Sequence, residues 1–297
     1  MDRSLSAIGF VGGGRRLRGD FLQLLAGSPA ETVTCDQGQY RVWRSSGGAR
    51  LFVHVAGPGV RAKDGGDAFA ITGVTPFHDF DAAVDVTVTG VIGLDRADPL
   101  AGAYICYLPP RRDGDRELQI VLEMVPFAAT PRADLPFNAS VEVLGLATEA
   151  TVYPSQSAYF VRVASARLVA PGSVVPLLTS AGAEVANAMA DDLRCTAIVT
   201  GSVLDSRRLV NSITDIPYWS LLVATERGTF ALAAAETDMH GTPAAGSIVQ
   251  AKARLVGRLR AISGPAAVPA PDLAAPDAAH RGIVPSPCNV RRTASVR

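Results

Sequence analysis

Two segments of the chain are similar in sequence: Val88-Thr-Gly-Val-Ile-Gly-Leu-Asp95 and Val199-Thr-Gly-Ser-Val-Leu-Asp205. We call this similarity an echo, and the expected fold depends on it. A second echo follows each copy, because Ser140–Leu146 is similar to Ser247–Ala253. The first pair of segments opens a block of predicted strands, and the second pair closes it. A glycine inside a long opening strand is typical of a bend where a small barrel turns a corner. We therefore expect two related β modules in a mostly β protein.

Alternation of apolar and polar residues predicts the strands of these modules. A long bent first strand, short meandering strands and a long late strand are typical of an OB-like barrel. A two-sheet sandwich has the same strand spacing and is the alternative. The predicted strands cover residues 84–92, 103–108, 118–125, 139–153 and 158–169 in the first module, and 196–204, 218–224, 229–235 and 248–259 in the second.

The N-terminal region has a different pattern. Residues 5–12 are expected to form a short strand, and the helical spacing of apolar residues predicts a helix over Arg15–Leu25. A β meander with strands at 32–35, 40–43 and 51–55 follows, and the stretch from Thr75 to Asp81 is expected to be a loop.

Segments rich in proline and glycine divide the chain. Residues 170–182 separate the modules, and a short helix is predicted at Glu184–Leu193. Beyond Ser263 the chain is rich in Pro and Ala and cannot bury enough apolar surface to offset its ordering entropy. The expected organisation is an N-terminal helix and meander (1–80), a first barrel-like module (81–182), a second (183–263) and a disordered tail (264–297).

The composition agrees with globular modules and restricts their partners. Of 297 residues, 48% are hydrophobic, and 28 basic residues balance 28 acidic ones. A neutral chain has no long-range attraction for nucleic acid or for an anionic membrane. The N-terminus lacks a signal-peptide pattern, and no stretch has 18 uninterrupted apolar residues. The arginine-rich, lysine-poor usage is associated with GC-rich bacteria, so we expect a bacterial cytoplasmic protein with no membrane association.

The four cysteines are too widely spaced for a zinc motif or a disulfide framework. No metal site is therefore expected from Cys35, Cys106, Cys195 and Cys288.

Several segments of the second module resemble a known group of proteins. Val199–Asp205, Pro217–Val223, Phe230–Ala233 and Gly246–Leu259 are similar to the C-terminal part of a family of uncharacterised bacterial β proteins. The resemblance covers about a fifth of the chain and implies a β fold. It carries no known chemistry, so it assigns no functional residue.

A glycine-rich segment near the N-terminus is the first candidate site. A strand, glycines and a helix in succession can hold an anion at the helix N-terminus. Leu17 stands at the third glycine position of a dinucleotide fingerprint, and a meander follows instead of a crossover, so no cofactor is expected. The alternative use of this segment is an anion-binding loop formed by Gly12, Gly13, Gly14, Arg15 and Arg16.

A basic strand face is the second candidate site. Alternate residues of a strand point to one side, and a basic face beside an aromatic residue is how OB barrels hold single strands of nucleic acid. A solvated strand face whose charges protect an edge is the alternative, and we favour it. The candidate polyanion-binding residues are Arg207, Arg208, Trp219, Lys252, Arg254, Arg258 and Arg260. Trp219 is also expected to anchor the core of the second module.

No catalytic constellation emerges. His78-Asp-Phe-Asp81 places two acids near an imidazole, which suits acid–base or metal chemistry, but a solvated polar turn is much the commoner explanation of such a segment. We therefore expect a non-enzymatic binding or interaction protein, with another protein as the default partner. One alternative is an OB-like protein that binds single-stranded nucleic acid or oligosaccharide. The other is an enzyme that uses the glycine-rich loop or the His78 segment.

Overall fold

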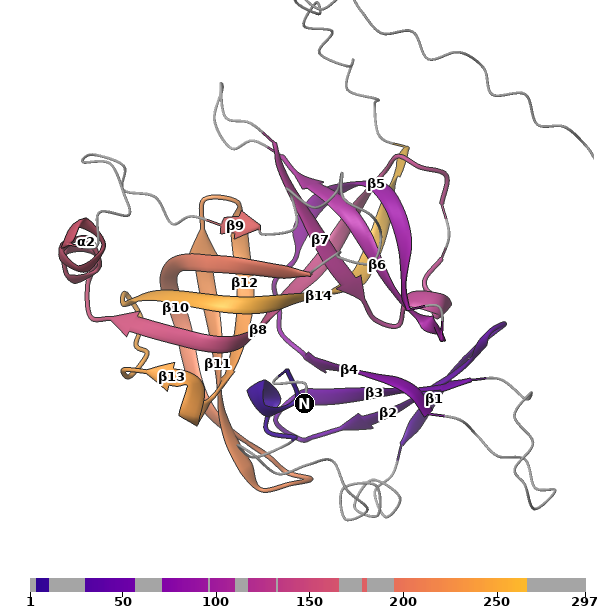
Figure 1. The fold of residues 1–297 in the computed structure, drawn as a ribbon, viewed down its shortest axis with the longest axis horizontal. Coiled ribbons are helices and arrows are strands. Elements are labelled where there is room, and N and C mark those ends of the chain that lie inside the picture. The colour runs from indigo at the N-terminus through magenta and orange to yellow at the C-terminus, as the bar shows by residue number, and fades with distance from the viewer. Residues whose placement is uncertain are drawn as a thin grey trace, which may run out of the picture. The chain divides into compact units, whose positions relative to one another are not determined.

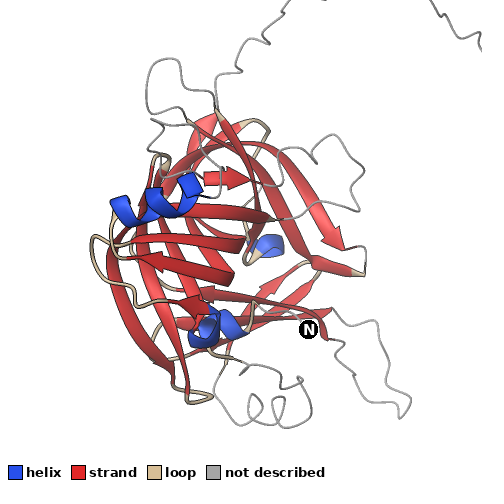
Figure 2. Ribbon diagram, turned by 60° about the vertical axis from the view of Figure 1, so that its left-hand side comes forward, coloured by secondary structure: helices blue, strands red, loops and turns tan. Residues whose placement is uncertain are grey.

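The computed structural model describes residues 4–10, 30–56, 71–95, 97–109, 117–131, 133–165, 178–180 and 195–265. The protein is mostly β: two sheets contain most of these residues, and the described chain has one α-helix, α2 (Gln156–Ser165) (Figures 1 and 2). Short 3-10 turns lie at η1 (Ser6–Ile8), η2 (Phe127–Ala129) and η4 (Glu236–Asp238).

The smaller sheet is an antiparallel meander of four strands in chain order. The three strands expected in this region are confirmed, but the sequence reading missed β4 and placed a loop at its end. Pro76 suggested that loop. The strand tolerates this proline because β4 is an edge strand, where a missing N–H leaves no ladder partner unpaired. The strands are β1 (Glu31–Cys35), β2 (Gly38–Arg44), β3 (Ala49–Ala56) and β4 (Ile71–His78).

The larger sheet has ten strands and contains both echoing blocks. Its strands are β5 (Val84–Asp95), β6 (Asp98–Leu108), β7 (Leu118–Met124), β8 (Phe137–Tyr153), β9 (Leu178–Ser180), β10 (Thr196–Asn211), β11 (Ile216–Thr225), β12 (Gly228–Ala235), β13 (Met239–His240) and β14 (Ile248–Pro265).

Strand pairing in this sheet closes two rings that share β8 and β14. The first ring runs β5–β6–β7–β14–β8 and back to β5, and the second runs β10–β11–β12–β8–β14 and back to β10. In each ring one pairing is parallel, β7 with β14 and β12 with β8. In Figure 1, β8 and β14 lie side by side between the two rings.

The sequence echoes occupy equivalent places in the two rings. The first echo lies in β5 and β10, the first strand of each ring, and the second lies in β8 and at the start of β14. Leu144 pairs with Val256 within the shared ladder, and a glycine follows each of them. A Cβ on Gly145 would lie 2.5 Å from Leu232 of β12, and one on Gly257 would lie 2.8 Å from Met124 of β7. Each glycine therefore allows the close approach of the parallel neighbour.

Two apolar cores result from the alternation of side chains along these strands. The first contains residues of both rings, such as Val143, whose neighbour Leu144 belongs to the second core. The second core joins the small sheet and the N-terminal turn to the other face of the rings, and it contains Tyr40 and Phe77 of the small sheet and Tyr218 of β11. Trp219 is only partly buried against the first core, so the deeper aromatic anchor of β11 is the adjacent tyrosine.

Two local predictions were wrong. Residues 5–12 were expected to form a strand, but Ser6–Ile8 form η1, and Gly9 caps it with a φ of 71° that turns the chain so that Phe10 N–H bonds Leu5 O. The strand predicted over residues 158–169 is α2 up to Ser165. There the hydroxyl of Ser155 accepts from Ala158 N–H at 3.2 Å, as a helix N-cap does. Local capping thus prevails over a run of β-branched and aromatic residues.

Other predictions lie outside the described residues. They are the helices at Arg15–Leu25 and Glu184–Leu193, the boundary near residue 182, and the tail beyond Pro265. The division into modules therefore stays a prediction. Within the described part of the chain, no helix has the length and apolarity to cross a membrane.

Candidate functional site

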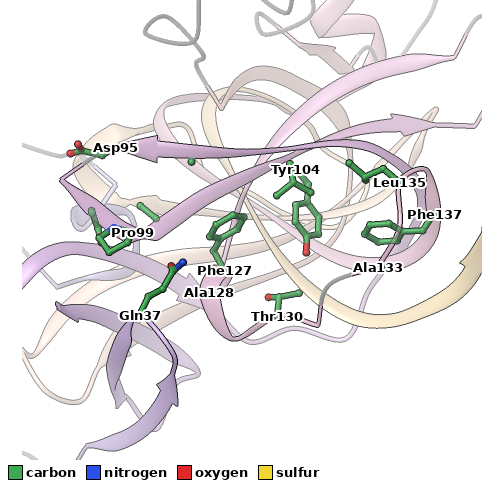
Figure 3. A pocket seen from close by; sticks show the side chains of 14 residues that line it. Gln37, Asp95, Pro99, Tyr104, Phe127, Ala128, Thr130, Ala133, Leu135 and Phe137 are labelled. Carbon is green, nitrogen blue, oxygen red and sulfur yellow. The ribbon is translucent and has the colours of Figure 1, made fainter. Parts of the chain in front are cut away.

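A cleft of about 430 Å³ lies on the first ring, beside the β5–β6 hairpin (Figure 3). Its other wall is the connection from β7 to β8, which contains η2. Gln37, in the turn between β1 and β2 of the small sheet, closes one side. Three elements distant in sequence therefore form one concave site.

Three aromatic side chains give the cleft its apolar character. Tyr104 comes from β6, Phe127 from η2 and Phe137 from the start of β8. The ring of Tyr104 meets that of Phe127 at 6.3 Å and 69°, and that of Phe137 at 6.0 Å and 88°. These are edge-to-face contacts, which align ring edges with ring faces. The three rings support one another and present a fixed surface.

The hydroxyl of Tyr104 is the polar group at the aromatic end of this surface. Figure 3 shows its oxygen pointing into the cleft. Within the described part of the chain this oxygen has no hydrogen-bond partner. Burial raises the pKa of Tyr104, with a smaller contribution from nearby Cys106, so the phenol stays protonated and can donate or accept. Tyr104 is 4% exposed, but its oxygen is not one of the fully buried unpaired atoms, so a ligand atom or a water molecule can reach it.

The position of Phe127 depends on a missing side chain. A Cβ on Gly102 would lie 2.2 Å from the ring of Phe127, so the ring packs directly over the backbone of β6. On the neighbouring strand, Gly93 lines the cleft and has open space where a Cβ would be. Gly102 therefore lets Phe127 pack against β6, and Gly93 leaves space in the cleft that a side chain would fill.

The small sheet holds the cleft wall in place through Tyr40. Its hydroxyl donates to Leu100 O at 2.6 Å and accepts from Ala128 N–H at 2.8 Å. One buried phenol therefore connects the β5–β6 hairpin side of the cleft to η2.

A buried polar chain continues from the cleft into the interface between the sheets. Asp98 lines the cleft, and its Oδ2 lies 2.6 Å from His54 Nδ1. His54 Nε2 lies 3.1 Å from the hydroxyl of Thr75, which donates to Glu123 Oε1 at 2.8 Å. Glu123 in turn forms an ion pair with Arg254. Hydrogen bonds and one ion pair therefore connect Asp98 of β6 to Arg254 of β14 through two residues of the small sheet.

The pKa of Asp98 reflects this chain. Burial alone would raise it, but hydrogen bonds from His54, Thr72 and Leu100 N–H outweigh burial and lower the pKa. Asp98 is therefore ionised at neutral pH.

The order Asp98–His54–Thr75 resembles a carboxylate–imidazole–hydroxyl triad, but its geometry does not suit catalysis. Thr75 is 1% exposed, and its proton is directed to Glu123 and not to the imidazole. A nucleophile must reach its substrate and give its proton to the base. We therefore read the chain as a polar bridge between the two sheets.

A second cleft, of about 440 Å³, lies on the second ring beside β10 and β11, and both polar and apolar side chains line it. His78 lines it, and its Nε2 hydrogen-bonds Gly47 O at 3.1 Å, while Nδ1 is buried without a partner among the described residues. Burial lowers the pKa of His78 against smaller opposing contributions from Gly47 and Asp79, so the ring is neutral.

The acids near His78 do not converge on it. The carboxylate of Asp79 binds Arg50 at 2.6 Å and Arg258 at 2.8 Å, and Asp81 is exposed and binds Arg260. The described residues contain no group of His, Cys, Asp and Glu that could hold a metal ion. His78 also terminates β4 and is 5% exposed, so the solvated loop expected there is wrong.

The candidate basic face is largely occupied by carboxylates. Arg258 Nε binds Glu142 at 2.5 Å, and Arg260 binds the same glutamate at 2.7 Å. The guanidinium carbon of Arg258 lies 4.9 Å from the centre of the Phe77 ring. Arg254 binds Glu123, and both glutamates are almost fully buried. The face was expected to be solvated, but this holds only for Lys252 and partly for Arg260, because β14 is an inner strand of the sheet.

The remaining predicted residues divide into two groups. Arg207 binds Asp205 at 2.9 Å, and Arg208 binds Glu236 on the exposed surface, opposite Trp219 in the β10–β11 ladder. The anion-binding candidates Gly12, Gly13, Gly14, Arg15 and Arg16 lie outside the described residues. The sequence reading missed the aromatic cleft completely.

Comparison with known proteins gives no further constraint. No protein family, no curated protein and no solved structure matches the chain. A function must therefore rest on the geometry of its clefts.

Proposed function

We propose that this chain is a non-enzymatic binding protein and that the aromatic cleft is its ligand site. The observation that carries the proposal is the fixed cluster of Tyr104, Phe127 and Phe137 around a cleft of about 430 Å³. Ligand sites are clefts of about 300–1,000 Å³ with apolar walls and few polar groups. The unpaired hydroxyl of Tyr104 is such a polar group.

The strand order gives independent support. The first ring pairs its strands in the chain order first, second, third, fifth, fourth, with one parallel contact, as an OB-like barrel does. The second ring has the same order when β8, which precedes β10 in the chain, takes the place of its fifth strand. OB barrels bind ligands on the face of their second and third strands and on the loop between the first and second. The aromatic cleft borders that loop, between β5 and β6. OB-like modules that exchange their last strands are thus our proposed description of the fold.

A single-stranded nucleic acid is the second candidate ligand. It is favoured by Arg208 beside Trp219 at the surface of β10 and β11. The guanidinium of Arg208 already has a carboxylate partner, so a phosphate would have to displace Glu236. We place this candidate behind the aromatic cleft, and the enzyme alternative behind both. The described cysteines are free, which agrees with the proposed cytoplasmic location.

The test is to fill the cleft. Gly93→Phe adds a ring where the structure has open space, and Val210→Phe adds one at an exposed position of β10 outside the cleft. A panel of ring-containing fragments is screened by ligand-observed NMR against both variants and the wild type. We expect fragments that bind the wild type and Val210→Phe but not Gly93→Phe. Fragments that bind all three proteins equally would contradict the proposal.

A further inference from the structure

The charge of the aromatic cleft has one sign in the described structure. Its described lining contains two carboxylates, Asp95 and Asp98, and no basic residue. The rest of the lining is apolar or neutral, with Gln37, Thr130 and Tyr104 as the uncharged polar side chains. The overall neutrality of the chain therefore does not extend to this site.

The two carboxylates have different roles. Asp98 is almost fully buried, and its oxygens accept hydrogen bonds from His54, Thr72 and Leu100 N–H. Asp95 is exposed, and its carboxylate accepts one hydrogen bond, from Ala97 N–H at 2.8 Å. A carboxylate has about four acceptor positions. Asp95 can therefore bind a ligand directly, whereas Asp98 acts only through its charge.

Charge and aromatic surface lie at opposite ends of the cleft. Figure 3 shows Asp95 and Pro99 at one end, Phe127 in the middle, and Tyr104 and Phe137 toward the other. A complementary ligand has a polar group at the Asp95 end and an apolar ring over the aromatic side chains. The negative faces of those side chains also attract positive charge.

We infer that the aromatic cleft binds a small organic cation, in which an ammonium group is joined to an apolar body the size of one ring. The ammonium group binds Asp95, and the ring lies against Phe127 and Tyr104. This inference rests on the proposed function and specifies its ligand class. An anionic ligand would approach the exposed carboxylate of Asp95 with no basic side chain in the described lining of the cleft, which costs free energy at any distance within a Debye length of about 8–10 Å.

Three probes of nearly equal shape test the inference on the full chain. They are 2-phenylethylammonium, neutral 2-phenylethanol and anionic 3-phenylpropionate, each titrated by isothermal calorimetry or ligand-observed NMR. We expect the cation to bind about tenfold more tightly than the alcohol, since an ion pair near a protein surface is worth about 1–2 kcal/mol and 1.4 kcal/mol is tenfold. The anion should bind most weakly, and the preference for the cation should fall with added salt.

Asp95→Asn removes the negative charge of the Asp95 side chain and keeps its shape. The variant should weaken binding of the cation about five- to tenfold and leave the alcohol unchanged, because only the charged group is removed. Val210→Phe should bind all probes as the wild type does, and Gly93→Phe should bind none.

The outcomes separate the inference from the proposed function. If the alcohol binds as tightly as the cation and Gly93→Phe abolishes both, the cleft is a ligand site but the inference is overturned. The same holds if Asp95→Asn leaves cation binding unchanged. If no probe binds, or Gly93→Phe has no effect, both the inference and the proposed function are overturned.

Discussion

Replacement of Asp98 by asparagine tests the buried polar bridge between the two sheets. Asp98 Oδ1 accepts from the hydroxyl of Thr72 at 2.8 Å and from Leu100 N–H at 3.1 Å, and Oδ2 accepts from His54 at 2.6 Å. Asparagine keeps one acceptor oxygen, but its amide N–H groups would face the N–H of His54. The variant loses a charge-assisted hydrogen bond and leaves buried donors unpaired, so we expect it to lower the free energy of unfolding by about 3–5 kcal/mol.

The lowered pKa of Asp98 determines how the effect of Asp98→Asn on stability changes with pH. The folded-state pKa of Asp98 lies below its unfolded value near 4, so its contribution is complete above the unfolded pKa. It is lost as the pH falls through the folded pKa. The difference in stability between wild type and Asp98→Asn should therefore be largest near pH 7 and shrink below about pH 4.

The assay is urea unfolding, followed by the fluorescence of the two tryptophans, at several pH values. Asp95→Asn on the same hairpin is the matched control, because an exposed carboxylate should change stability by no more than about 0.5 kcal/mol. Equal stabilities of wild type and Asp98→Asn at pH 7 would refute the bridge. A difference that stays constant down to pH 3 would refute the assignment of an ionised Asp98.

Three further predictions follow from the packing. Reversal of Arg254 and Arg258 to glutamate should lower the free energy of unfolding by about 3–5 kcal/mol, because two buried carboxylates would then face like charges; unchanged thermal unfolding would show a truly solvated face. Tyr218→Ala should cost about 3–5 kcal/mol and Trp219→Ala about 2 kcal/mol, since the tyrosine is 0% exposed and the tryptophan only partly buried; the reverse order in urea unfolding would contradict the two cores. Gly102→Ala should displace the ring that covers it, at a cost of about 1–3 kcal/mol, and weaken fragment binding to the aromatic cleft; unchanged NMR shifts of the aromatic protons would contradict the contact.

Alternation and turn residues were sufficient to predict most strands and the echo between the blocks. They could not show that β8 and β14 are shared, because strand patterning gives the faces of a strand and not its partners. The sequence missed β4 because Pro76 is read as a breaker, and only the position at an edge makes it tolerable. It misread α2 because the capping hydroxyl of Ser155 was outweighed by β-forming residues.

The candidate site was harder to predict than the fold. Its three aromatic residues come from separate elements, and nothing in their spacing indicates that they meet. The sequence does contain a signal that carboxylates neutralise the basic face. Glu123 and Glu142 lie inside apolar strands, where a buried carboxylate requires a partner, and the arginines of β14 were available.

The two rings differ in what covers the hairpin between their first two strands. In the second ring, the β10–β11 hairpin is covered by the chain itself: Asn211 Nδ2 donates to Ile8 O, and Ser212 exchanges hydrogen bonds with Ser45 and Ser46 of the β2–β3 turn. The β5–β6 hairpin of the first ring is held from behind by Tyr40 and its cleft side is left open. Since the echoing strands place both hairpins equivalently, the second ring shows that such a hairpin supports a packed partner. We therefore propose that the open hairpin, with its aromatic rings already fixed, is where an external ligand takes the place that the chain itself fills in the second ring.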